Sequence, residues 1–210
     1  NLMVPLFNPG PIAHPAIPIH LAAVNKVMCS VAGEVADGIR PHPVCTPSYI
    51  ANVMRPAVRS GARKAGRSLD SFRVCMKPLT ASARTREELV PKIRDARARI
   101  AFYASTPAYA AAFEHHGLGE LAREAAVLSK AQRWEELPRL ISDETLDLFA
   151  VIGTYDEIGR KLTDRFRRVV TDVEFSIAVR DEQDRADLSR LARDIQTDSE
   201  AEARQAILSH

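Results

Sequence analysis

The segment best suited to chemistry is the short turn Val24-Asn25-Lys26-Val27-Met28, which ends a predicted strand and opens a predicted helix. The first backbone N–H groups of a helix have no partner within it, and the helix dipole places partial positive charge there. Such a turn therefore suits an anion, for example a phosphate. The alternative is a plain strand-to-helix turn that binds nothing.

His42 is the second candidate, because it lies between two prolines at the end of the next predicted strand. An imidazole at that place could donate to a carbonyl or a phosphate, or act as an acid or base near neutral pH. A neighbouring backbone group could equally satisfy its ring. The residues alone leave both interpretations open.

For the other side chains that could do chemistry, a structural role is at least as good an explanation as a functional one. His115 and His116 are adjacent, so on a helix they point about 100° apart and cannot chelate one ion. Cys29, Cys45 and Cys75 match no zinc spacing, and buried thiols are expected. No metal site is predicted.

Two further groups carry a structural and a functional interpretation. Glu34 and Asp37 could form a carboxylate pair, although capping and solvation of a helix end is the more common role of such residues. Tyr103, Thr106 and Tyr109 could line a pocket, but capping by Thr106 and core packing by the tyrosines would explain them too.

The elements that would position these residues alternate in type. Strands are predicted at residues 17–24, 38–44, 72–80 and 169–179. Helices are predicted at residues 26–36, from Thr46-Pro47 to about residue 65, at 154–166 and beyond 180. This alternation indicates a parallel sheet. Residues 85–150 contain no predicted strand and form a helical insertion, in which Pro91 should kink the first helix or move its start.

Composition narrows the possible partners. Lys+Arg 29 against Asp+Glu 27 gives a net charge of +2, without a basic block, which predicts no nucleic-acid partner. No apolar run reaches the 18 or so residues of a membrane span, so no membrane partner is expected. Three cysteines without a close pair favour a reducing cytoplasm.

Three stretches resemble one known family. The first, residues 18–44, reads PIHLAAVNKVMCSVAGEVADGIRPHPV; the others are IAFYASTPAY at 100–109 and FAVIGTYDEIGRKL at 149–162. Together and in this order they are similar to the C-terminal half of the luciferase-like monooxygenase superfamily, and most similar to its F420-dependent branch.

The resemblance implies a fold and a cofactor. The fold would be α/β, a partial (β/α)8 TIM barrel with about four parallel strands and a helical insertion. It would occupy residues 1–180, followed by a charged helix and tail at 181–210. The cofactor would be coenzyme F420, or alternatively FMN, contacted by Val24, Asn25, Val27 and Met28. His42 would lie in the substrate pocket.

The implied activity belongs to an intact barrel. Such an enzyme would pass a hydride between reduced F420 or FMN and a small-molecule organic substrate, while no residue of this chain is assigned as the catalyst. Alternatively the chain is an inactive remnant that associates with itself. Four parallel strands cannot close a barrel, so we expect unpaired sheet edges and exposed apolar faces, and therefore a homo-oligomer.

Overall fold

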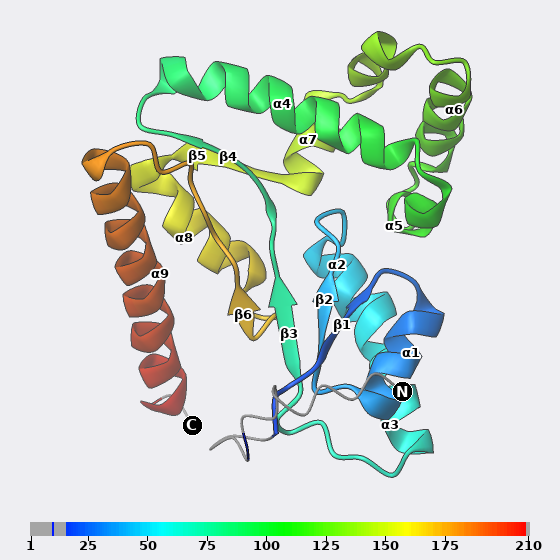
Figure 1. Cartoon of the computed structure of the whole chain (residues 1–210), viewed down its shortest axis with the longest axis vertical. Coiled ribbons are helices and arrows are strands. Elements are labelled where there is room, and N and C mark those ends of the chain that lie inside the picture. The colour runs from blue at the N-terminus through cyan, green and yellow to red at the C-terminus, as the bar shows by residue number, and fades with distance from the viewer. Residues whose placement is uncertain (1–9, 11–15, 209–210) are drawn as a thin grey trace.

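The computed structural model describes residue 10 and residues 16–208, with side chains described up to residue 197, so most of the proline-rich lead-in at 1–16 lies outside the described residues. Its centre is a parallel four-stranded sheet with the order β1-β2-β3-β6 (Figure 1). The strands are β1 (His20–Ala23), β2 (Gly38–Pro41), β3 (Arg73–Met76) and β6 (Asp172–Val173). Each of the four predicted strand segments contains one of these strands, and each strand is shorter than predicted.

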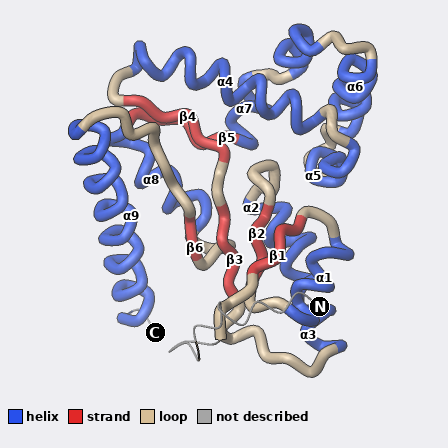
Figure 2. Tube along the Cα trace, viewed as in Figure 1, coloured by secondary structure: helices blue, strands red, loops and turns tan. Residues whose placement is uncertain are grey.

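A second, two-stranded parallel sheet was not predicted. It pairs β4 (Leu79–Ala83) with β5 (Ala150–Thr154), and lies beyond the ends of the first sheet (Figure 2). Only Lys77 and Pro78 separate β3 from β4, so one extended stretch of chain serves both sheets. The prediction of a single strand at 72–80 was therefore wrong, and proline, which has no N–H to donate, marks the change of partner.

The helices that flank the main sheet begin where their capping residues predict. The helix α1 spans Lys26–Val35, while α2 (Pro47–Tyr49), a π-helical turn (Ile50–Met54) and α3 (Arg55–Lys64) follow one another without a break. The Thr46 side chain accepts a hydrogen bond from the Tyr49 N–H at 3.2 Å. At the start of α8 (Tyr155–Phe166), Glu157 accepts from the Thr154 N–H at 3.0 Å, which completes a capping box where the helix was predicted to begin.

The helical segment lies over the carboxyl ends of the sheet strands (Figure 1). Its helices are α4 (Arg86–Ala104), α5 (Ala110–Glu114), α6 (Gly119–Lys130) and α7 (Asp143–Phe149), with 3₁₀ turns at Pro107–Tyr109 and Trp134–Leu140. Pro91 lies inside α4 and does not move its start. Thr106 does not cap a helix, because its hydroxyl donates to the Phe102 carbonyl.

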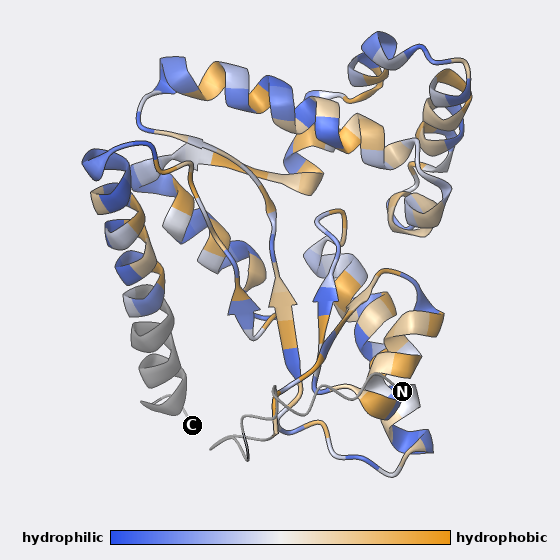
Figure 3. Ribbon diagram, viewed as in Figure 1, coloured by the Kyte–Doolittle hydropathy of each residue, from blue (hydrophilic) through white to orange (hydrophobic). Residues whose placement is uncertain are grey.

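The crossing of α1 and α3 is unusually close and decides which face of α1 is buried. A Cβ atom on Gly33 would lie 2.1 Å from the Val58 carbonyl oxygen, and one on Gly61 would lie 1.9 Å from the Ser30 carbonyl oxygen. Only small side chains fit such a crossing. Val27, Val31 and Val35, which recur at the spacing of a helix, consequently lie on its outer face, where Val27 and Val35 are 74% and 70% exposed. Figure 3 shows the hydrophobic character of the helix.

The two faces of the main sheet differ in polarity. Side chains alternate along a strand, so Ile39, Val74 and Met76 are buried on one face while Arg40 and Arg73 lie exposed on the other. Ion pairs cross this second face, from Arg73 to Asp172, from Arg40 to Glu174 and from Lys77 to Glu174. This face of the sheet is therefore polar, and the exposed apolar side chains lie elsewhere, for example on α1.

The last helix, α9 (Glu182–Leu208), is joined to the second sheet by a buried charge cluster. Arg84, which follows β4, donates to Asp184 and to Asp187 at 2.7 Å each, and the Asp184 side chain is fully buried. Asp184 also accepts from the Arg180 N–H at 2.9 Å. Among the described helices, none is long and apolar enough to cross a membrane.

Candidate functional site

A cavity of about 500 Å³ brings most of the predicted site residues together. It opens at the carboxyl ends of β1 and β2, and Val24, Asn25, Met28 and His42 all line it. The Val27 side chain does not line it and points to solvent. The two candidate segments, the turn that opens α1 and the end of β2, therefore form one site, as expected if both act on the same ligand.

The start of α1 faces this cavity without a side-chain cap. Asn25 occupies the N-cap position, but its side-chain amide donates to the Ala108 carbonyl at 3.0 Å instead of bonding the first turn. This hydrogen bond fixes the turn to the helical segment above it. The N–H groups of Lys26, Val27 and Met28 have no partner among the described residues and can bind an anion, assisted by the helix dipole.

The His42 ring packs against two tyrosine rings. Its ring stacks on Tyr109, with centroids 4.1 Å apart, and meets the edge of Tyr103 at 4.7 Å. Its Nδ1 accepts a hydrogen bond from the Val44 N–H at 3.4 Å. Burial lowers the pKa of His42, so the ring is neutral at neutral pH. With Nδ1 as the acceptor, the proton resides on Nε2, which can donate to a ligand.

Charged residues complete the wall of the cavity. Arg40 and Lys77 line it, and both pair with Glu174, Lys77 at 3.1 Å. The rest of the lining is largely apolar, including Pro41, Pro43 and Tyr109. A flat, mostly apolar ring system with an anionic substituent suits such a lining. Arg40 was not predicted as a site residue, although a charged side chain inside a short apolar strand is a signal that this position faces away from the helices.

His115 and His116 join the helical segment to the start of α2. His116 Nε2 lies 2.8 Å from the Thr46 hydroxyl, and His115 Nε2 lies 2.8 Å from the Ser48 hydroxyl. Both histidines therefore have a structural role. No group of three or more potential metal ligands occurs within the described residues.

The cysteines differ in their surroundings. Burial raises the pKa of Cys29 to about 11 and that of Cys45 to about 12, so both are thiols at neutral pH. Cys75 is half-buried and lies on the polar face of the sheet, 3.4 Å from His20 Nδ1 and 3.4 Å from the Asp172 carboxylate. Burial and the hydrogen bond to Asp172 raise the pKa of Cys75 as well, which argues against a nucleophilic role.

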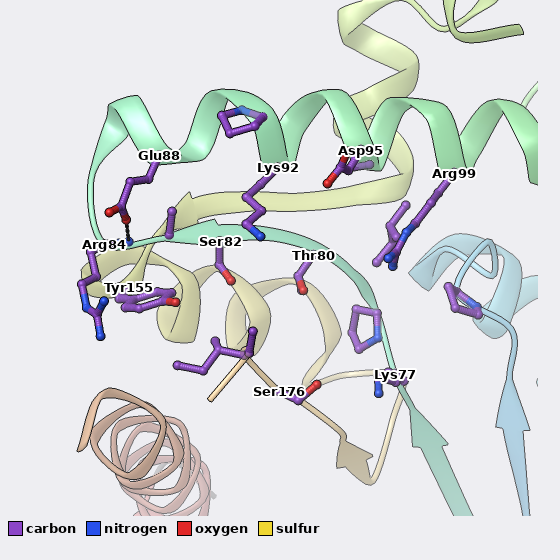
Figure 4. Close-up of a pocket in the computed structure, with 18 of the residues that line it drawn as sticks. Lys77, Thr80, Ser82, Arg84, Glu88, Lys92, Asp95, Arg99, Tyr155 and Ser176 are labelled. Atoms are coloured by element: carbon purple, nitrogen blue, oxygen red, sulfur yellow. Dashed lines mark hydrogen bonds between the residues drawn. The ribbon is translucent and has the colours of Figure 1, made fainter. Parts of the chain in front are cut away.

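A second cavity, of about 650 Å³, adjoins the first and shares Pro43 and Lys77 with it. It lies between α4, β4 and the chain that follows β6 (Figure 4). Tyr103 lines this second cavity and Tyr109 lines the first, so both tyrosines are pocket residues as one interpretation of the sequence had it.

Comparison with known proteins identifies relatives of one kind. A model of the luciferase-like monooxygenase family matches residues 3–172. An uncharacterised protein of Mycobacterium tuberculosis is 39% identical over 82% of this chain and 51% of its own length. A 5,10-methylenetetrahydromethanopterin reductase of Archaeoglobus fulgidus is 26% identical over 80% of this chain and 48% of its own length.

A solved structure shows the same fold. The coenzyme F420-dependent tetrahydromethanopterin reductase from Methanopyrus kandleri superposes with a TM-score of 0.60 at 24% identity, over 75% of this chain and 44% of the reductase. The chain spans about half the length of the curated relatives it matches. Its sheet and helices correspond to part of a TIM barrel.

Proposed function

The chain belongs to the luciferase-like monooxygenase family, and from that premise we propose that it supplies part of the cofactor site of an F420-dependent oxidoreductase. The observation that carries the proposal is the single cavity at the ends of β1 and β2, which gathers Val24, Asn25, Met28 and His42. Barrel enzymes bind their ligands at this end of the strands. The reductase from Methanopyrus kandleri, which is named for coenzyme F420, favours F420 over FMN.

The residues present fit the deazaflavin cofactor. The first-turn N–H groups of α1 would bind an anionic group of its side chain, and the apolar wall with Met28 would contact the ring system. The neutral His42 would donate from Nε2 to a carbonyl of the ring or of the substrate. When bound, F420 supplies the chemistry by giving or accepting a hydride. The chain's own residues bind and orient it and exclude water.

Cofactor fluorescence tests this proposal directly. The chain is titrated with F420 and, separately, with FMN. Ala22 is exposed and lines the cavity, so Ala22→Trp should fill it and weaken F420 binding at least tenfold. Ala98, exposed on α4 and outside the cavity, provides the matched control, Ala98→Trp. Equal F420 binding by both variants, or no F420 binding by the unaltered chain, would contradict the proposal.

We also propose self-association as a second function, carried by the outer face of α1. Val27, Val31 and Val35 recur at helical spacing and all are exposed. Apolar surface of this kind stabilises contacts between molecules. In sedimentation velocity, Val31→Glu should convert an oligomer to monomer. A monomeric unaltered chain, or an oligomer that Val31→Glu leaves intact, would count against this surface.

A further inference from the structure

The cavity beneath α4 is a separate compartment next to the proposed cofactor site. It shares Pro43 and Lys77 with that site, so a ligand in one cavity is the immediate neighbour of a ligand in the other. Its walls come from α4 above, β4 behind and residues 176–180 below. An oxidoreductase requires two reactants side by side, and the geometry offers a place for the second one.

Two cations that line this cavity form no ion pair among the described residues. Figure 4 shows Lys92 and Arg99 extending from α4 toward the side of the cavity that carries β4. Neither makes a hydrogen bond or an ion pair within the part of the chain that the structure describes. They differ in this from Lys77, which pairs with Glu174, and from Arg84, which pairs with Asp184 and Asp187.

The facing wall adds hydrogen-bond donors. Thr80 and Ser82 are two residues apart on β4, so both side chains lie on the same face of that strand, and both line the cavity. Their hydroxyls have no partner among the described residues. Asp95 lies between the two cations on α4 and pairs with neither, so it can accept a hydrogen bond from a hydroxyl of a ligand.

We propose that this cavity binds the anionic group, a phosphate or a carboxylate, of the organic substrate. The planar guanidinium of Arg99 can hold two oxygens of such a group, and Lys92 adds a second positive charge. The hydroxyls of Thr80 and Ser82 donate to the remaining oxygens. The inference rests on the proposed function, since it takes the neighbouring cavity as the place of the cofactor.

Titration with inorganic phosphate tests the anion site. Amide chemical shifts are followed by NMR in the unaltered chain and in Arg99→Gln, Lys92→Gln and the control Arg94→Gln. Arg94 is exposed on the same helix, also lacks a partner among the described residues and does not line the cavity. Saturable shifts are expected in β4 and α4, with affinity about tenfold weaker in the first two variants only.

Two outcomes of this titration would overturn the site. One is the absence of saturable shifts in residues 79–104. The other is an equal loss of affinity in Arg94→Gln, which would mean that phosphate responds to the general charge of α4 and not to the cavity.

A second experiment distinguishes the substrate from the anionic tail of the cofactor as the ligand of this cavity. F420 is titrated by fluorescence into the same variants. Unchanged F420 affinity in Lys92→Gln and Arg99→Gln supports a separate substrate site. A parallel loss of F420 affinity would assign these cations to the cofactor tail and overturn the proposal. Phosphate binding without F420 binding would contradict the proposed cofactor site, while showing that the cavity itself accepts anions.

Discussion

Replacing Gly61 with alanine should force α1 and α3 apart. The new Cβ atom would lie 1.9 Å from the Ser30 carbonyl oxygen, whereas ordinary contact begins at 3.4 Å. The atoms that the new Cβ would meet belong to the backbone of Ser30, so no side-chain rotation can relieve the clash. The helices must therefore separate by about 1.5 Å at their crossing, and the contacts around Cys29 and Ala32 must loosen with them.

The cost follows from two opposing effects. Overpacking a tight contact costs about 3 kcal/mol at the upper end of its usual range. Alanine recovers about 1 kcal/mol, because it favours the helix over glycine. The free energy of unfolding should thus fall by about 2 kcal/mol, which in a chain of this size lowers the Tm by about 4–8 °C.

Urea and thermal unfolding, followed by circular dichroism, measure the loss. Gly159→Ala is the matched control: Gly159 also lies inside a helix, but its added Cβ would meet only the Ile195 side chain, at 3.4 Å. This variant should be neutral or up to about 1 kcal/mol more stable. If Gly61→Ala is as stable as Gly159→Ala, the close crossing does not limit the packing of α1.

Three further results are expected. Burial lowers the pKa of His42, so below pH 6.5 the unfolded chain binds more protons than the folded chain. The contribution of His42 to the free energy of unfolding is therefore present above pH 6.5 and is lost as the pH falls through the folded pKa. NMR titration of the imidazole should give a pKa below 6.5. Asp184→Asn removes the charge that Arg84 and the Arg180 backbone bind, so amide exchange in residues 182–197 should accelerate. A thiol reagent should label the half-exposed Cys75 before the buried Cys45, and Cys75→Ser should abolish labelling of the native chain.

The sequence predicts the elements of the main sheet because capping residues and apolar runs are local signals. Thr46-Pro47 and the pair Thr154 and Glu157 mark helix starts that the structure confirms. The second sheet has no such signal. The strand β5 is five residues long and contains Gly153, and β4 continues an extended run in which only Pro78 marks the change of partner.

The faces of the elements are harder to predict than the elements themselves. Periodic valines predict α1, yet the structure buries Ala32 and Gly33 and exposes Val27, because the distant Gly61 permits a crossing that only small residues fit. The sequence indicates part of the candidate site, the α1 turn and His42. Lys92 and Arg99 become notable only in the fold, which places them above β4 without a partner among the described residues. The buried face of α1 and the position of these two cations both depend on contacts between segments far apart in the chain.

The parallel pairing of β4 with β5 also sets an order of events during folding. Leu79 pairs with Ala150 and Ala83 with Thr154, so the whole helical segment must first bring the chain back. Helices form through local contacts, whereas pairing of distant strands is slow because the loop between them has to close. We therefore expect the helices of this segment to form first and the second sheet later. Until that step, β4 pairs with no strand and the wall that carries Thr80 and Ser82 is unfinished. An anion bound beneath α4 would therefore stabilise the late state, in which β4 and β5 are paired.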